Sequence, residues 1–304
     1  MDKKKLIAAL GVTTGVSYLS YKLISEEMFK RVFSCRHYDP YLKPEIKNLI
    51  ETFDIKKIQR DSFDGLKLYA EDIHNQAHNR YIIMVHGIWS RRENMYERAV
   101  EFDKLGYNVL IVDQRGAGES EGKYYTYGMK ESMDLLIWID YLVSTYSDVQ
   151  ICLYGLSMGA ATVMMATANQ LPEAVKCIIE DCGYSSMKEE LDHVLRKDYK
   201  LAYTGIVLKL IENRMQEEFG ITYEDVNIKK FLENNSIPIL FIHGKADEFV
   251  PYDMAKMLYN HNKGSKKFYP VENAGHTEAN TDPDYYSNVN GFIRAYMDLF
   301  IDKT

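Results

Sequence analysis

The sequence contains a serine between two glycines, in the pattern that presents a hydroxyl for nucleophilic attack. Gly155-Leu156-Ser157-Met158-Gly159 follows the apolar run Ile151 to Tyr154 and precedes the small residues Ala160-Ala161-Thr162. A G-x-S-x-G sequence between a strand and a helix forms a sharp, strained turn that exposes the serine, and the flanking glycines prevent collisions. Ser157 is therefore the candidate nucleophile.

A serine hydroxyl is a poor nucleophile by itself, so this chemistry also needs a general base and an acid that orients the base. In the chain order Ser, Asp/Glu, His, both groups follow the serine. His276, beside Gly275 and after the strand-like segment Lys267 to Val271, is the candidate base.

The candidate acid is Asp247, which comes shortly after the apolar run Ile239 to Ile242. Glu248 is a rival, because adjacent residues on a turn point in different directions and the sequence does not choose between them. Asp181, at the end of another apolar run, is a second rival, although it also suits a capping role. We favour Asp247 over both.

Acyl transfer also needs N–H donors for the oxyanion, and removing one donor costs on the order of 3 kcal/mol. The backbone N–H of Met158, at the positive end of the following helix, is one candidate. The N–H of Ile88 is the other, in the loop after the run that ends in His86-Gly87. Trp89 beside it either lines the substrate pocket or packs in the interior.

These residues need a sheet whose strands are buried on both faces. Continuous apolar runs of four or five residues, rather than alternating ones, are typical of such parallel strands. They recur at Tyr81 to Val85, Val109 to Val112, Ile151 to Tyr154, Val175 to Ile179 and Ile239 to Ile242. Segments with helical spacing lie between them, such as Glu131 to Tyr146, and each would be the crossover of a right-handed β-α-β unit. The predicted fold class is α/β, with a mostly parallel, doubly wound sheet.

Two further segments complete the predicted organisation. Asp54 to Asp61 and Leu66 to Asp72 alternate apolar and polar residues around Asp64-Gly65, which predicts an antiparallel hairpin at the start of the sheet. The connection at about residues 184–236 is too long for a loop and has helical patterns, so we interpret it as an inserted helical lid. The predicted domains are a hydrophobic N-terminal segment at 1–30 and an α/β domain at 31–304.

The composition argues against several classes of partner and cofactor. The 304 residues are 46% hydrophobic and 27% charged, as in ordinary globular proteins. The 44 acidic and 37 basic side chains give a formal charge of -7, the wrong sign for a broad nucleic-acid-binding surface. Four cysteines, none in a C-x-x-C pair, argue against a disulfide scaffold and against structural zinc. We expect no nucleic-acid partner and no metal.

The N-terminus is the exception in this composition. Three lysines at residues 3–5 precede an uncharged run from Leu6 to Tyr21, which Lys22 could extend through Ile24 by snorkelling. The run is shorter than the ~20 residues that usually cross a bilayer. We favour an uncleaved signal anchor with the catalytic domain outside the cytoplasm, because the lysines precede the run. A cleaved signal peptide and a helix packed on a cytoplasmic protein are the alternatives.

The motifs together resemble the α/β-hydrolase superfamily. Besides the serine turn and the positions of His86-Gly87, Asp247 and His276, the stretch Asp113 to Gly122 is similar to the D-x-R-G-x-G-x-S-x-G turn of its esterase and prolyl-oligopeptidase-like branches. Within these, the chain looks most like poorly characterised serine hydrolases of Gram-positive bacteria with a hydrophobic N-terminus. The similarity runs from about Asp54 to Phe300, and it departs at Ala117, where the family often has histidine.

The resemblance implies a triad of Ser157, His276 and Asp247 that needs no metal or organic cofactor. We expect an ester hydrolase that acts on small to medium acyl groups of small-molecule esters. An amidase or peptidase, a thioesterase and an acyltransferase remain alternatives, because the same triad serves all of them. A catalytically silent binding protein of the same fold is a further alternative, although such proteins usually lose one triad residue.

Overall fold

The computed structural model describes residues 18–36 and 42–297, and these residues divide into two compact units. The smaller unit comprises the described residues up to Ser34 together with Ser186–Asn227. The larger unit comprises the described residues of Cys35–Ser185 and those from Ile228 onward. The candidate nucleophile, base and acid all belong to the larger unit.

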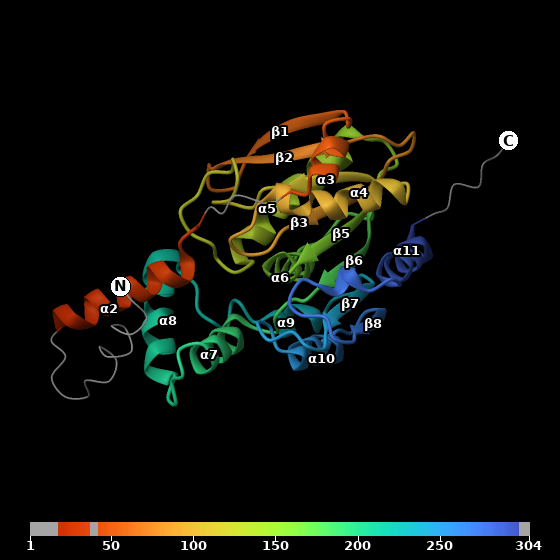
Figure 1. Cartoon of the computed structure of the whole chain (residues 1–304). Coiled ribbons are helices and arrows are strands. Elements are labelled where there is room, and N and C mark those ends of the chain that lie inside the picture. Colours follow the sequence, from red (N-terminus) through yellow and green to blue (C-terminus); the bar gives the residue numbers. More distant parts are fainter. Residues whose placement is uncertain (1–17, 37–41, 298–304) are drawn as a thin grey trace. The chain divides into compact units, whose positions relative to one another are not determined.

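The larger unit is built on an eight-stranded mixed sheet with the order β1-β2-β4-β3-β5-β6-β7-β8 (Figure 1). The strands are β1 Ile55–Asp61, β2 Lys67–Ile73, β3 Arg80–Val85, β4 Asn108–Val112, β5 Gln150–Leu156, β6 Val175–Asp181, β7 Ile239–Gly244 and β8 Lys266–Val271. β1 and β2 form the predicted antiparallel hairpin, and β2 pairs antiparallel with β4. The six strands from β3 to β8 in the chain are mutually parallel, which confirms the predicted fold class.

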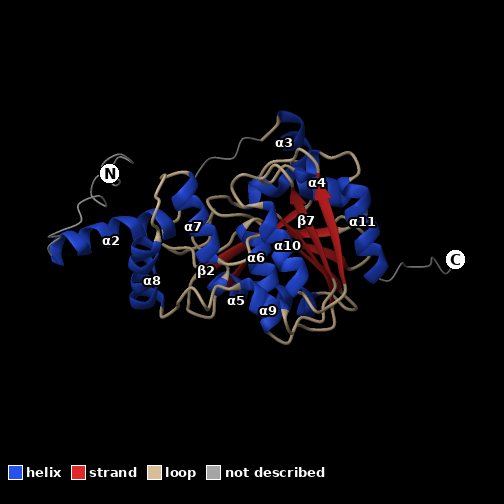
Figure 2. Ribbon diagram, turned by 90° about the horizontal axis from the view of Figure 1, so that it is seen from below, coloured by secondary structure: helices blue, strands red, loops and turns tan. Residues whose placement is uncertain are grey.

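Helices of the larger unit lie on both faces of the sheet, as Figure 2 shows. These helices are α3 Pro44–Ile50, α4 Tyr96–Lys104, α5 Met129–Thr145, α6 Met158–Met165, α9 Ile228–Leu232, α10 Tyr252–His261 and α11 Tyr285–Tyr296, with short 3-10 turns at Arg92–Met95, Ala166–Ala168 and Ala279–Thr281. One face packs its apolar side chains against α3, α4 and α11, and its core includes Phe102, Tyr154 and Phe292. On the other face α6 contacts β5 and β6 and packs beside α5 and α9.

The smaller unit consists of α2 Tyr18–Phe33, α7 Met187–Lys197 and α8 Gly205–Phe219. The predicted insertion at 184–236 thus contains α7 and α8, together with α9 of the larger unit. Phe29 and Phe33 of α2 pack against Phe219 of α8, with ring centroids 5.5 and 5.4 Å away. Arg214 of α8 also bonds to Glu26 of α2 at 3.0 Å.

Residues 6–17 of the predicted membrane anchor lie outside the described residues, so the anchor stays a prediction. None of the helices in the described ranges is long and apolar enough to cross a membrane. α2 begins within the predicted segment at Tyr18, and its sequence contains Lys22, Glu26, Glu27, Lys30 and Arg31.

Candidate active site

The candidate nucleophile lies at the turn from β5 into α6, the context that its motif predicts. Ser157 has φ 56° and ψ -116°, a backbone conformation that residues other than glycine rarely adopt. The neighbouring glycines make this turn possible. A Cβ at Gly155 would lie 2.2 Å from the carbonyl oxygen of Gly159, and a Cβ at Gly159 would lie 2.0 Å from that of Val85. Both contacts are with backbone, so neither position accepts a side chain without displacing a strand or a helix.

The structure brings Ser157, His276 and Asp247 together although 119 residues separate the first two in sequence. His276 Nε2 lies 2.9 Å from Ser157 Oγ, and its Nδ1 lies 2.7 Å from Asp247 Oδ2. Both distances are those of hydrogen bonds. Because an ionised carboxylate only accepts, Nδ1 carries the ring proton and Nε2 faces the serine as an acceptor.

Asp247 is held from several sides in a turn after β7. Its Oδ1 accepts hydrogen bonds from the backbone N–H groups of Phe249 and Val250, both at 2.9 Å. Burial opposes ionisation of this carboxyl, but hydrogen bonds from His243 and His276 outweigh it and hold the pKa of Asp247 well below its usual range. Asp247 is therefore an anion at neutral pH.

Asp181, a rival for the acid position, belongs to a different network. Its Oδ2 accepts hydrogen bonds from the hydroxyl groups of Tyr154 and Tyr285, at 3.0 and 2.7 Å. Glu248, the other rival, follows Asp247 directly. The hydrogen bond of His276 Nδ1 goes to Asp247.

The two predicted oxyanion donors lie at the ends of neighbouring strands. Met158 is the first residue of α6, so its N–H has no acceptor within the helix. Ile88 follows Gly87, where a Cβ would lie 3.2 Å from the Cβ of Ser157. This close approach places the loop after β3 directly against the nucleophile.

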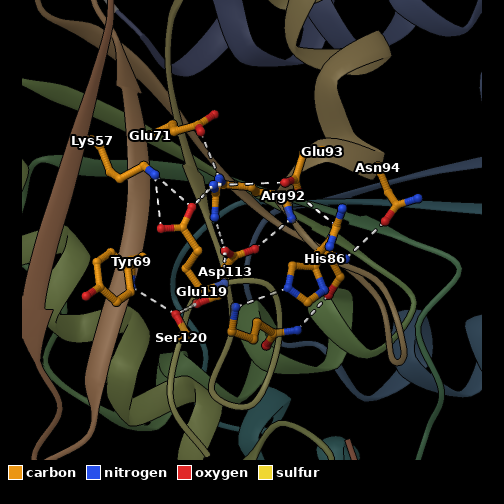
Figure 3. Close-up of polar contacts among 12 residues, drawn as sticks. Lys57, Tyr69, Glu71, His86, Arg92, Glu93, Asn94, Asp113, Glu119 and Ser120 are labelled. Atoms are coloured by element: carbon orange, nitrogen blue, oxygen red, sulfur yellow. Dashed lines mark hydrogen bonds and ion pairs between the residues drawn. The ribbon is translucent and has the colours of Figure 1, made fainter. Parts of the chain in front are cut away.

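A buried charge network holds the far end of that loop, and sequence reasoning missed it (Figure 3). We name Glu71, Arg92, Asp113 and Glu119 the arginine cluster. The Arg92 side chain is only 6% exposed and bonds to Glu71 at 2.8 Å, to Asp113 and to Glu119. Asp113 also accepts the backbone N–H of Arg92 at 2.8 Å and that of Glu119 at 3.0 Å. The cluster therefore ties the loop after β3 to the turn after β4.

His86 adds a second connection between the same two loops. Its Nε2 accepts the backbone N–H of Gln114 at 3.1 Å, so Nδ1 carries the proton and donates to the Gly87 carbonyl at 2.7 Å. Burial lowers the pKa of His86, which keeps this ring neutral. The ring therefore satisfies backbone groups of both loops.

One aromatic side chain contacts the candidate base, and another was predicted to line the pocket. Phe249, which sequence reasoning missed, lies over the His276 ring with centroids 4.9 Å apart and is 36% exposed. Trp89, the predicted pocket residue, is half-buried at φ 56°, and the guanidinium of Arg36 lies 4.8 Å from its ring. Nothing in the sequence marks Phe249 except its place two residues after the acid.

Cys182, Asp247 and His276 have potential metal-ligating atoms within 4.8 Å of one another. However, the 2.7 Å between His276 Nδ1 and Asp247 Oδ2 is a hydrogen-bond distance, shorter than the separation of two atoms that share one zinc ion. The geometry thus fits a proton between these two groups. The expectation that no metal or cofactor is needed stays a prediction.

Comparison with known proteins supports the fold. The family described as alpha/beta hydrolase fold matches residues 81–220, which include the serine turn and the loop after β3. The uncharacterized protein YqkD of Bacillus subtilis is 27% identical over 270 residues, which cover 86% of this chain and 88% of YqkD.

Two similar proteins carry names that describe an activity. The lysophosphatidylserine lipase ABHD12 of Gallus gallus is 26% identical over 208 residues, covering 66% of this chain and 52% of that lipase. The esterase Pf2001 of Pyrococcus furiosus superposes with a TM-score of 0.70 at 23% identity, covering 87% of this chain and all of the esterase. At that identity the superposition shows a common fold alone.

Proposed function

We propose that this chain, a protein of the α/β-hydrolase fold that is related to YqkD and ABHD12, is a serine hydrolase of carboxylic esters with small to medium acyl groups. The observation that carries the proposal is the hydrogen-bonded line from Ser157 through His276 to Asp247, with distances of 2.9 and 2.7 Å. The esterase and lipase names of similar proteins support the same class of reaction.

In the proposed reaction His276 Nε2 accepts the proton of Ser157 as Oγ attacks the ester carbonyl carbon. The bond to the leaving alcohol breaks, the alcohol oxygen takes the proton from His276, and the acyl group remains on Ser157. Water then loses a proton to His276 and attacks the acyl-enzyme, which releases the carboxylic acid and returns the proton to Ser157. Asp247 stays ionised, fixes the tautomer of His276 and stabilises the imidazolium.

The backbone N–H groups of Ile88 and Met158 are the proposed donors to the oxyanion of the tetrahedral intermediate. Two features support them: the close approach of Gly87 to Ser157, and the position of Met158 at the N-terminus of α6. Phe249 and Trp89 are the proposed contacts for the apolar part of the substrate.

The test is hydrolysis of p-nitrophenyl acetate, butyrate and octanoate by the full chain and by Ser157→Ala, with a fluorophosphonate probe as an independent readout. We expect turnover and labelling by the wild type and loss of both in Ser157→Ala. Ser144→Ala, an exposed serine on α5, is the matched control and should keep both. The preferred acyl length then reports the size of the pocket.

Each other outcome points to a different function. A folded wild-type protein that neither labels nor turns over would contradict the active site and favour a binding protein. Labelling without turnover of any of the three esters would contradict the substrate class and favour an amide, a thioester or an acyl acceptor. Labelling that persists in Ser157→Ala would place the nucleophile elsewhere.

A further inference from the structure

A buried histidine and a buried glutamate lie behind Asp247, and the reaction outlined above uses neither. His243 is the next-to-last residue of β7, and Glu180 is the next-to-last residue of β6. Neither residue is measurably exposed. We name Glu180, His243 and Asp247 the histidine cluster.

The strand register places the first two side chains on the same face of the sheet. Glu180 pairs with Phe241 across the parallel β6–β7 ladder, and paired residues in parallel strands point to the same side. His243 lies two residues beyond Phe241, so it points to that side too. The Glu180 side chain extends past the strand end, where its Oε2 accepts the Gly183 N–H at 2.8 Å. The Glu180 carboxylate therefore lies near the end of the sheet where His243 also lies.

The hydrogen bonds of His243 fix which of its nitrogens can change protonation. Nε2 lies 2.9 Å from the Val250 carbonyl oxygen, which can only accept, so Nε2 carries a proton. The same nitrogen lies 3.3 Å from Asp247 Oδ2, the oxygen that also bonds His276. Asp247 therefore has an imidazole on each side of one carboxylate oxygen.

Two buried atoms of the cluster have no hydrogen-bond partner among the described residues: His243 Nδ1 and Glu180 Oε1. Buried polar atoms seldom stay unpaired, and these two atoms belong to titratable groups that act on each other through their charges. Burial raises the pKa of Glu180 to about 7, while His243 acts in the opposite direction. Burial lowers the pKa of His243, but the bond to Asp247 and the charge of Glu180 outweigh it, so the net shift is upward.

We propose that Glu180 and His243 are positioning residues that extend the triad behind Asp247, because the negative charge of Glu180 favours the protonated form of His243. When His243 Nδ1 is protonated, the imidazolium stabilises Asp247 as an anion and holds its Oδ2 toward His276. Glu180 stabilises the imidazolium. The catalytic part of this inference rests on the proposed function, whereas the effect of the Glu180 charge on His243 does not.

Other titratable groups near the pair are few within the described part of the chain. Asp181 and Cys182 follow Glu180, and burial raises the pKa of the Cys182 thiol well above its ordinary value. The Tyr252 ring of α10 lies 6.1 Å from the His243 ring, measured between centroids. A change in the titration of His243 therefore reports on Glu180 and Asp247, provided that these neighbours are unchanged.

The test compares Glu180→Gln with Asp181→Asn in the full chain. Both substitutions remove one buried carboxylate from the end of β6, but only Glu180 belongs to the histidine cluster. By NMR of histidine labelled with ¹³C and ¹⁵N, we expect the pKa of His243 to fall by about one pH unit in Glu180→Gln and to stay unchanged in Asp181→Asn. We also expect kcat/KM for p-nitrophenyl butyrate at pH 7 to fall about tenfold in Glu180→Gln, in kcat rather than KM, and less than twofold in Asp181→Asn.

The wild type supplies a measurement that does not depend on either variant folding. Its ¹⁵N spectrum should show His243 Nε2 protonated from pH 5 to 9, with Nδ1 as the nitrogen that titrates. A neutral His243 protonated at Nδ1, or equal effects of the two substitutions, would overturn the proposal. Absence of ester turnover in the wild type would contradict the proposed function alone, because the NMR titration still tests the effect of Glu180 on His243.

Discussion

The arginine cluster and the histidine cluster lie behind opposite sides of the candidate site and differ in the cation at their centre. Arg92 is charged at any pH at which the protein folds, and it bonds to each of its three carboxylates. His243 can lose its charge, and two atoms of its cluster have no partner among the described residues. The permanently charged guanidinium of Arg92 can therefore hold a loop in place at any pH. The imidazole of His243 can instead gain or lose a proton in response to neighbouring charges.

The largest expected loss of activity comes from replacing Asp247, the triad acid within the histidine cluster. Asp247→Asn should reduce kcat/KM for p-nitrophenyl butyrate on the order of 10⁴-fold, because an amide can donate to His276 Nδ1 and so favour the wrong tautomer. Glu248→Gln is the matched control and should retain most of the activity. If Glu248→Gln showed the larger loss, Glu248 rather than Asp247 would be the triad acid, and the contact of His243 with Asp247 would not support the triad.

The next largest effect should be on stability, at the arginine cluster. Arg92→Met leaves Glu71 and Asp113 buried without their cation, which we expect to reduce the free energy of unfolding by about 3–5 kcal/mol. Urea unfolding followed by circular dichroism measures the loss. Arg196→Met, which removes an exposed arginine paired with Asp192, should leave the unfolding midpoint in place. A loss below about 1 kcal/mol in Arg92→Met would show that the cluster is not the support of the loop after β3.

The sequence predicts the strand ends well because a parallel sheet brings its carboxyl ends to one edge. Ser157, Asp247 and His276 each follow a predicted strand, and the structure places them within hydrogen bonds of one another. The second contact of His243 depends on the turn that carries Asp247 back toward β7, and a sequence pattern does not fix that turn. A histidine at the end of a strand, four residues before an aspartate, is the signal that was available.

The arginine cluster could not be predicted for a different reason. Its members come from β2, from the turn after β3 and from the loop after β4, so they meet only because β2 pairs with β4. The order of strands in a sheet depends on tertiary packing, which periodicity along the chain does not report. The helices α2 and α8 illustrate the same limit. The apolar spacing within each helix does not predict that Phe29 of α2 packs against Phe219 of α8.

The third prediction is a pH dependence of stability that Glu180 of the histidine cluster should produce. The pKa of Glu180 is raised from 4.5 to about 7 on folding, so between these values the folded chain binds more protons than the unfolded chain. Stability from this group is complete below pH 4.5 and falls as the pH rises toward 7. From pH 4.5 to 6.5, Glu180→Gln should therefore gain about 2 kcal/mol relative to the wild type.

Urea unfolding at several pH values between 4.5 and 6.5 measures this gain. Asp247 does not confuse the result, because its pKa is lowered on folding and its contribution is lost only as the pH falls below its ordinary value of 3.8. His243 has a raised pKa, so its contribution is lost above 6.5, outside the range. Parallel curves for the two proteins would mean that Glu180 ionises normally, and the contrast between the two clusters would disappear.

The smallest expected effect separates the centre of the arginine cluster from its edge. Lys57 bonds to Glu119 at 2.7 Å, the same carboxylate that Arg92 reaches, but both side chains of this pair are about half exposed. Because exposed pairs are screened by water and salt, Lys57→Ala should cost less than about 0.5 kcal/mol, and less still in 1 M NaCl. Urea unfolding beside Arg92→Met measures the difference. A loss comparable to that of Arg92→Met would mean that the cluster depends on its total positive charge rather than on the buried guanidinium.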